Sequence, residues 1–299
     1  MDLTIGPNAF FWPAETVRAF YAGLVRTPAA RVVIGEWVCS KRLPFWEQEI
    51  PAAVEALKAA GKDVALSSLA LITLPRERRQ TEELFATGLP VEIADLSALR
   101  HLPEGHPFWV GPVVNVYNEG TLDWLAQKGA RRICLPVELP LASVGVLARA
   151  GAERGIAVEV WGHGKPPLAL SARCYHARLH DRTKDACQFV CGEDPHGRAV
   201  ETLEGRAFLT VNGIQTLGHA VTTAARQMAA LQAAGVAALR LSPQPGDFAA
   251  LVAAYAAHLG DSNPAALVRT LQALQPGEPL ADGFLDGRPG LAEVPRALA

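Results

Sequence analysis

Residues 132–161, RICLPVELPLASVGVLARAGAERGIAVEVW, carry the pattern that decides the fold. Two short runs rich in Val, Ile and Leu, Arg132–Val137 and Ile156–Trp161, flank a longer segment, Leu141–Ala150, whose apolar residues have helical spacing. Parallel strands need a crossover connection of this length, and a helix usually forms it. The stretch therefore predicts a strand–helix–strand unit.

The same alternation of short apolar runs and helical patterns extends along most of the chain. We expect six further strands at Leu3–Gly6, Arg31–Gly35, Asp63–Leu69, Val91–Ala94, Phe108–Val116 and Ala237–Leu241. Eight strands with intervening helices predict an α/β fold, namely a (β/α)8 barrel of the TIM type. The prediction includes barrels that are irregular or incompletely closed. An open doubly wound sheet is the alternative.

Segments of other kinds set the expected domain organisation. Long helices are predicted at Trp46–Ala60 and Ala220–Ala234, and an additional strand at Ala207–Asn212. The alternation breaks after the seventh strand, where residues 164–198 form a cysteine-containing insertion. We expect residues 1–263 to form a single domain and residues 264–299, rich in Pro and Gly, to be a tail packed on it.

Composition and charge exclude several classes of protein. A net charge of −2 and a pI near 6.5 give no support for nucleic-acid binding. Apolar residues make up 49% of the chain, enough for a large core, but no apolar run is long enough to span a membrane. The first residues lack a secretory pattern, so a cytoplasmic protein is expected.

Three of the five cysteines, Cys174, Cys187 and Cys191, lie in the polar segment SARCYHARLHDRTKDACQFVCG, residues 171–192. In a reducing compartment, clustered cysteines favour a metal or catalytic role over disulfides. Cys39 follows the second strand, and loops that follow barrel strands meet at one face, so Cys39 can join the other three. Cys134 lies inside the sixth strand and is expected to be a buried structural residue.

Four thiolates can hold zinc or an iron–sulfur cluster. Structural zinc sites usually contain two close pairs of cysteines, whereas here only Cys187 and Cys191 form such a pair. The scattered spacing favours a 4Fe-4S cluster over zinc, and unconnected free thiols are the remaining alternative.

Three other residues are candidates for catalytic roles. Glu159 and His163 come at the end of the seventh strand, where acid–base groups of a barrel belong, although a histidine that bonds to loop backbone is the commoner interpretation of His163. Arg173 precedes Cys174, and Lys165 lies nearby. These cations can stabilise thiolates, bind an anionic substrate or simply face solvent.

Three segments carry a resemblance to a known family: TIGPNAFFWPAET at residues 4–16, GEWVCSKR at 35–42, and SARCYHARLHDRTKDACQFVC at 171–191. Over nearly its full length the chain resembles the collagenase-like peptidase family, U32. Many members have a cysteine seven residues before Cys174, where this chain has Pro167. The resemblance implies that Cys39 supplies the missing ligand, so that the 4Fe-4S ligands are Cys39, Cys174, Cys187 and Cys191.

The branch of this family that the chain resembles most implies a specific function. Its members take part in oxygen-independent hydroxylation of the ubiquinone ring precursor, a prenylated phenol, as a heterodimer with a UbiU-like sister protein. A UbiT-like lipid-carrier protein is linked to the pathway, and relatives use prephenate as the oxygen donor. The two carboxylates of prephenate would suit a clamp that includes Arg173 and Lys165.

Two other functions remain as alternatives. The chain can be a non-catalytic partner whose 4Fe-4S cluster stabilises a sister hydroxylase subunit. A peptidase is the least supported, because the sequence contains neither a G-x-S-x-G nor an H-E-x-x-H motif. A groove for a prenyl tail can lie among Phe10, Phe11, Trp12, Phe45 and Trp46, although aromatic core packing is the commoner explanation.

Overall fold

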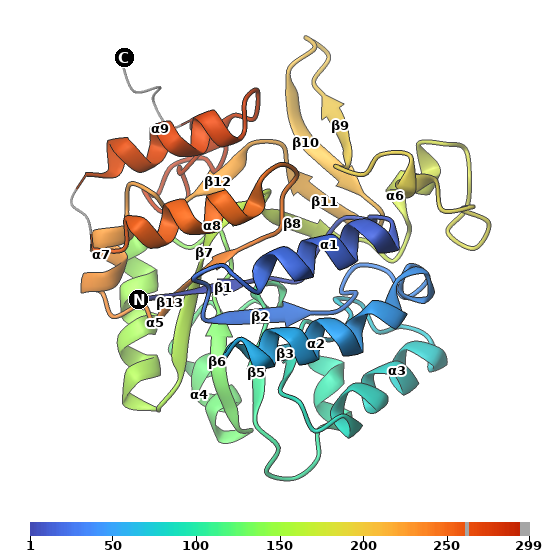
Figure 1. Ribbon diagram of the computed structural model, residues 1–299, viewed down its shortest axis with the longest axis horizontal. Coiled ribbons are helices and arrows are strands. Elements are labelled where there is room, and N and C mark those ends of the chain that lie inside the picture. Colours follow the sequence, from blue (N-terminus) through green and yellow to red (C-terminus); the bar gives the residue numbers. More distant parts are fainter. Residues whose placement is uncertain (261–262, 294–299) are drawn as a thin grey trace.

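Eight parallel strands form a closed barrel in the computed structural model, which describes residues 1–260 and 263–293 (Figure 1). Neighbouring strands follow chain order, and the last strand pairs with both the first and the seventh, which closes the barrel. The predicted TIM-type fold is confirmed, and the open sheet is excluded. The barrel strands are β1 (Asp2–Ile5), β2 (Arg31–Ile34), β3 (Asp63–Ser67), β4 (Val91–Ile93), β5 (Phe108–Val110), β6 (Ala130–Cys134), β7 (Ala157–Gly164) and β13 (Ala238–Leu241).

Helices surround the barrel and pack their apolar faces against it (Figure 1). Local chemistry fixes where they begin: Pro75 opens one helix while the Glu77 carboxylate accepts the backbone N–H groups of Thr73 and Leu74. The helices are α1 (Ala14–Leu24), α2 (Ile50–Ala59), α3 (Pro75–Ala86), α4 (Glu119–Gln127), α5 (Leu141–Glu153), α7 (Met228–Ala233), α8 (Phe248–Ala257) and α9 (Pro264–Leu274).

Two predicted helices are shorter in the structure than the sequence indicated. The segment predicted as a helix from Trp46 contains a 3-10 turn before α2, because Trp46 has a non-helical φ of −147°. The segment Ala220–Ala234 begins instead with strand β12 (Val221–Thr223), which pairs antiparallel with β7. Its β-branched residues favour a strand, and only α7 remains helical.

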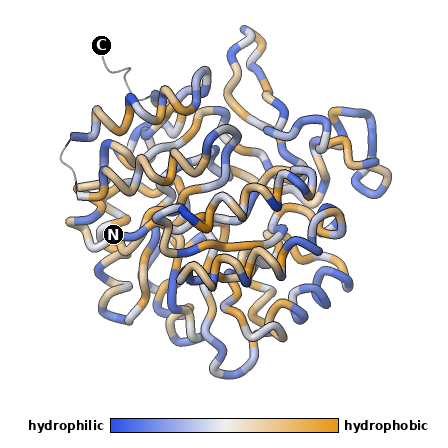
Figure 2. The backbone as a smooth tube through the Cα atoms, in the orientation of Figure 1, coloured by the Kyte–Doolittle hydropathy of each residue, from blue (hydrophilic) through white to orange (hydrophobic). Residues whose placement is uncertain are grey.

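The cysteine segment connects two strands of a second, antiparallel sheet that lies outside the barrel. Its strands are β8 (Pro167–Leu170), β11 (Gln215–Gly218), β10 (Ala207–Asn212) and β9 (Arg198–Glu201), and the short helix α6 (Tyr175–Arg178) lies between β8 and β9 in the chain. This part lies beside the carboxyl end of β2 (Figure 1), and much of its outer chain is hydrophilic (Figure 2). The non-barrel part therefore extends beyond the predicted insertion at 164–198.

The C-terminal segment covers one side of the barrel. Helix α9 packs on α8, and the short strand β14 (Leu280–Ala281) pairs in parallel with β12. The predicted tail thus contains regular structure, and its residues 294–299 lie outside the described residues. Among the described residues, no helix combines the length and the apolarity needed to cross a membrane.

An ion cluster fills part of the barrel interior. The guanidinium of Arg240 donates to both Glu92 carboxylate oxygens, at 2.9 and 2.5 Å, and to Glu159 at 2.8 and 3.1 Å. Arg132 and the hydroxyl of Thr4 also donate to Glu159, at 3.1 and 2.7 Å. Burial would raise the pKa of Glu159, but Arg240 and Arg132 outweigh it and lower that pKa.

We expect Arg240→Met to lower the free energy of unfolding by about 3–5 kcal/mol, because the buried Glu92 carboxylate would lose its cation and Glu159 would keep only Arg132. Urea unfolding of both proteins measures this difference. Arg18→Met is the matched control: it removes a partly exposed pair with Glu49, which should change stability little. Equal stability of Arg240→Met and the native protein would contradict the prediction.

Candidate functional site

Four cysteines from two distant parts of the chain line one cavity. Cys39 comes from the loop after β2, while Cys174, Cys187 and Cys191 come from the segment around α6. The structure therefore brings together the four residues that the sequence grouped. It places Cys134 elsewhere, fully buried in β6, where burial raises the pKa of its thiol.

The loop after β2 holds Cys39 through two local features. Gly35 has a φ of +147°, and a Cβ at this position would lie 2.9 Å from the carbonyl oxygen of Ser67, so only glycine allows this close approach. The Glu36 carboxylate then accepts the backbone N–H groups of Val38 and Cys39, at 2.8 and 3.0 Å. These bonds fix the backbone that presents the Cys39 thiol.

Lys41 connects this loop to the cysteine segment. Its ammonium group donates to the carbonyl oxygens of Lys184 and Asp185, at 2.8 and 3.1 Å, and lies 3.8 Å from the sulfur of Cys187. It also lies 5.9 Å from the centre of the Phe189 ring. A cation is thus placed beside one of the thiols and against the loop that carries it.

Arg42 is a second cation at the cavity, and it is 1% exposed. Its guanidinium donates to the Ala9 carbonyl at 3.1 Å and to the Asn212 side chain at 2.9 Å. Burial would lower its pKa, but Cys191, Glu36 and Cys39 outweigh burial and raise it. Arg42 therefore stays charged, and it favours thiolates over thiols at this cavity.

Burial acts against the thiolate form of two of the cysteines. It raises the pKa of Cys39, although Arg42 opposes the change. It also raises the pKa of Cys174, whose sulfur accepts the Ala177 N–H at 3.4 Å as an opposing contribution. A metal that binds here would have to displace protons from these thiols.

Glu159 and His163 both lie in β7, but neither side chain is open to the barrel mouth at which the sequence predicted them. Glu159 is fully buried in the interior ion cluster. His163 is also fully buried, and its ring nitrogens contact the Tyr255 hydroxyl at 3.1 Å and the Gln275 side chain at 2.8 Å. Burial lowers the pKa of His163 to about 4, so its ring is neutral near pH 7.

The two predicted cations near Cys174 lie in different surroundings. Arg173 is exposed, and its backbone N–H bonds to the Ser171 hydroxyl. Lys165 is buried and lies 3.5 Å from the Glu278 carboxylate. Of the two, Arg173 has the side chain that a solute can reach.

Sequence reasoning missed a group next to the cysteine cavity. His176 lines that cavity and its Nε2 donates to the Asp194 carboxylate at 2.8 Å, and His180 stacks on His176 with 5.7 Å between ring centres. The spacing of His176 and His180, four residues apart, was the signal available in the sequence. Arg198 lies 3.4 Å from His180, and this cation opposes metal binding there.

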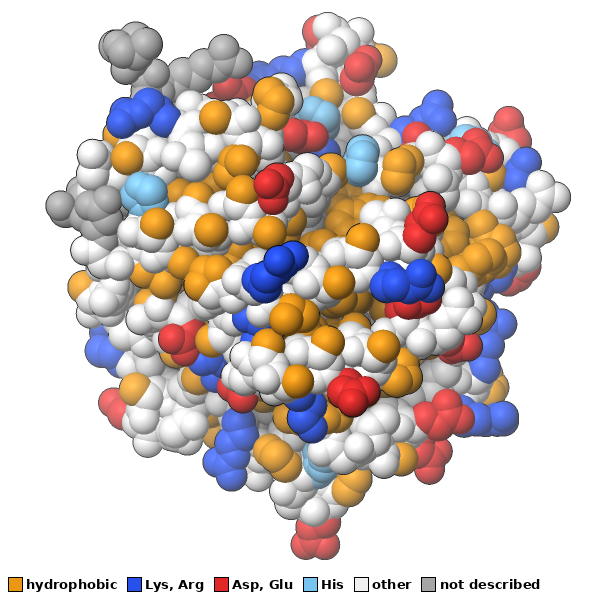
Figure 3. Space-filling view, viewed as in Figure 1, with side chains coloured by type: hydrophobic (Ala, Val, Ile, Leu, Met, Phe, Trp, Pro, Cys, Tyr) orange, Lys and Arg blue, Asp and Glu red, His pale blue; other side chains and the backbone are white. Residues whose placement is uncertain are grey.

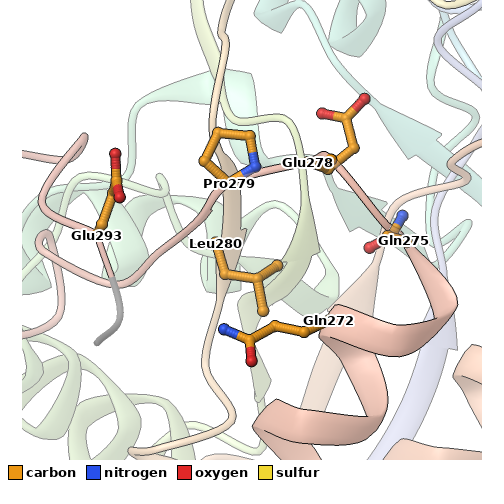
Figure 4. Close-up of a pocket in the computed structure, with 7 residues that line it drawn as sticks. Gln272, Gln275, Glu278, Pro279, Leu280 and Glu293 are labelled. Carbon is orange, nitrogen blue, oxygen red and sulfur yellow. The ribbon is translucent and has the colours of Figure 1, made fainter. Parts of the chain in front are cut away.

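A separate cavity of about 340 Å³ lies at the end of α9 (Figure 4). Gln272, Glu278 and Leu280 are among the residues that line it, and it shares none of its lining residues with the cysteine cavity. It is therefore a feature of the C-terminal segment and not part of the cysteine site.

A closed parallel barrel with polar side chains beyond its strand ends is an architecture that many enzymes use. The pattern of peptidase family U32 matches residues 16–290 of this chain. Because the match spans most of the sequence, the chain belongs to peptidase family U32. Family and fold together suggest a catalytic role.

Several solved structures are similar to this chain at low identity. A mandelate racemase/muconate lactonizing enzyme from Roseiflexus sp. has 11% identity and a TM-score of 0.36, over 54% of this chain and 48% of that protein, so this chain spans about half of its length. A putative fructose-1,6-biphosphate aldolase from Coccidioides immitis has 12% identity and a TM-score of 0.41, over 91% and 86%. Tryptophan synthase from M. tuberculosis has 15% identity and a TM-score of 0.39, over 91% and 89%.

We expect Lys41→Met to loosen the cysteine segment, because it removes two charge-assisted hydrogen bonds to backbone carbonyls worth roughly 1–3 kcal/mol. Limited proteolysis should cut residues 181–186 several-fold faster than in the native protein. Lys58→Met, on the exposed face of α2, is the control and should leave the rate unchanged. Equal cleavage of all three proteins would show that Lys41 does not hold the segment.

His163 should make stability depend on pH below neutrality. Its pKa is lower in the folded state, about 4, than the ordinary value of 6.5, so the unfolded chain binds more protons between these values. The stability contribution is fully present above pH 6.5 and falls by roughly 3 kcal/mol as the pH drops to 4. Denaturant unfolding of the native protein and of His163→Gln across this range measures the difference in slope. Identical slopes for the two proteins would contradict the prediction.

Proposed function

We propose that this chain is a UbiV-like iron–sulfur subunit of an oxygen-independent hydroxylase that acts on the ubiquinone ring precursor. The observation that carries the proposal is the cavity lined by Cys39, Cys174, Cys187 and Cys191. The departure from the wider family, with Pro167 in place of a cysteine, also agrees with a ligand set that includes Cys39. Membership of family U32 supports the proposal at the level of the family.

The spacing of the sulfurs supports a cluster over a single zinc ion. Tetrahedral zinc has Zn–S bonds of about 2.3 Å, which puts its ligand sulfurs about 3.8 Å apart. In the described part of the chain, no three of the four cysteine sulfurs all lie within 4.8 Å of one another. A 4Fe-4S cluster accepts wider spacing, because each sulfur binds a different iron.

The small size of the cavity favours a single zinc ion over a cluster, but it is the weaker of the two observations. The void is about 20 Å³, close to the space that one water molecule needs. Coordinate bonds of about 2.3 Å are much shorter than non-bonded contacts, so a bound cluster needs less free volume than an unbound molecule of equal size. The sulfur spacing therefore outweighs the cavity size and favours a cluster.

The residues around the cavity suit an anionic group. When bound, a 4Fe-4S cluster would supply one-electron redox chemistry, with a potential set by nearby hydrogen bonds, charge and burial. Lys41 and Arg42 place two cations at the cavity, one beside Cys187 and one near Cys191. The rings of Phe11, Phe45 and Phe189 pack together next to these cations, with 4.6–6.2 Å between ring centres.

The proposal includes partners and small molecules. The hydroxylase would be a heterodimer with a UbiU-like protein, supplied by a UbiT-like lipid carrier, with a prenylated phenol as substrate and prephenate as the oxygen donor. The exposed Arg173 is the candidate for binding a carboxylate of prephenate, since Lys165 is paired with Glu278.

A structural role is the second candidate function, and one observation favours it. The cysteines join the barrel loop of Cys39 to a segment whose first cysteine, Cys174, lies 135 positions later in the sequence. A cluster held there would fix the segment in place for a sister subunit, whether or not it transfers electrons. A folded variant with a redox-inert metal in place of the cluster would remain active only if the role of the cluster is structural.

We expect the anaerobically purified protein to contain about four irons and four sulfides per chain, with broad visible absorbance that Cys39→Ala abolishes. Iron and sulfide analysis with an absorption spectrum measures this. Cys134→Ala is the matched control and should keep the full content, since Cys134 lies outside the cavity. Zinc in place of iron, or an unchanged spectrum in Cys39→Ala, would refute the ligand assignment.

A further inference from the structure

An open groove of about 570 Å³ lies beside the cysteine segment at the carboxyl end of the barrel. One wall comes from the loop after β1 and from α1, another from residues 244–246 after β13, and a third from the cysteine segment. Figure 3 shows hydrophobic side chains in a hollow between α1 and α8. The residues that line the groove include Trp12, Pro13, Phe20, Gly192, Pro195 and Pro245.

Contacts between aromatic rings and one hydrogen bond hold the walls of the groove in place. The Trp12 and Phe20 rings meet edge to face with 5.4 Å between centres, and Phe20 packs on Phe248 at 5.5 Å. The Trp12 indole donates to the Pro195 carbonyl at 3.1 Å, which joins the barrel wall to the residues just after the cysteine segment. The groove is therefore preformed, as ligand sites usually are.

The lining also restricts the kind of ligand. No Lys, Arg, Asp or Glu of the described residues lines the groove, so nothing there balances the charge of an anion such as prephenate. Thr16, His196 and Gln244 supply the polar groups that can bond to a hydroxyl. An uncharged ligand that is mostly apolar and carries one hydroxyl suits this lining best.

The groove and the cysteine cavity share a wall. Cys191 lines the cavity, and the next residue, Gly192, lines the groove. A Cβ at Gly192 would lie 3.4 Å from the Phe11 ring, so the loop packs closely here. A ligand in the groove would be one residue away from a proposed cluster ligand.

We propose that this groove binds the aromatic ring of a prenylated phenol, with the first prenyl units on the apolar floor and the rest of the tail leaving through the open side. This inference rests on the proposed function and assigns the phenol site to this chain. The volume lies within the range of small-molecule sites, about 300–1,000 Å³. Aromatic walls suit a ring that must lie flat near the redox centre.

The test is equilibrium dialysis of 2-geranylphenol against the anaerobically purified protein, native and with Ala19→Trp. Ala19 lines the groove from the exposed face of α1, so tryptophan there fills the space without removing a core side chain. We expect at least a tenfold loss of affinity. Thr16→Trp, one turn away on α1, serves as a second blocking variant should Ala19→Trp fail to fold.

Ala56→Trp, on the exposed face of α2, is the matched control and should bind like the native protein. Absence of binding to the native protein, or equal affinity in the blocked variants, would overturn the inference. Iron content measured on the same samples separates the two proposals. A native protein that holds its iron but does not bind the phenol refutes only the groove, whereas binding without iron supports the groove and refutes the redox role.

Discussion

One buried guanidinium, that of Arg42, joins the parts on which the candidate site depends. It donates to the Ala9 carbonyl after β1 and to Asn212 at the end of β10, and it lies near Cys39 and Cys191. A buried cation needs partners of this kind, since its desolvation is costly. Arg42 therefore both holds the second sheet against the barrel and supplies positive charge at the cysteine cavity.

The barrel was predictable because short apolar runs alternate with helical patterns along the chain, and the grouping of the cysteines followed from the convergence of barrel loops. The surroundings of the Glu159 and His163 side chains could not be predicted from the sequence in this way. Strict alternation would put both on one face of β7, but the pairing with β13 shifts register between Trp161 and His163. This irregularity turns His163 outward against Tyr255, and such shifts leave little trace in sequence.

The cysteine cavity and the groove have different chemical character although one loop separates them. Lys41 and Arg42 make the cavity cationic, whereas the groove is uncharged and lined by aromatic and proline residues. An anionic centre and an apolar ligand would thus each find a suitable environment on either side of residues 191–192. The sequence alone could not indicate this arrangement, because the groove walls come from three distant segments.

The closing strand β13 has a consequence for the order in which the parts of the molecule become available during synthesis. All four cysteines of the cavity precede it in the chain, so they have all been made while β1 and β7 still lack the neighbour that closes the barrel. Unpaired strand edges pair readily with other chains. The nascent protein therefore presents its complete set of thiols at the stage when it is most exposed to aggregation.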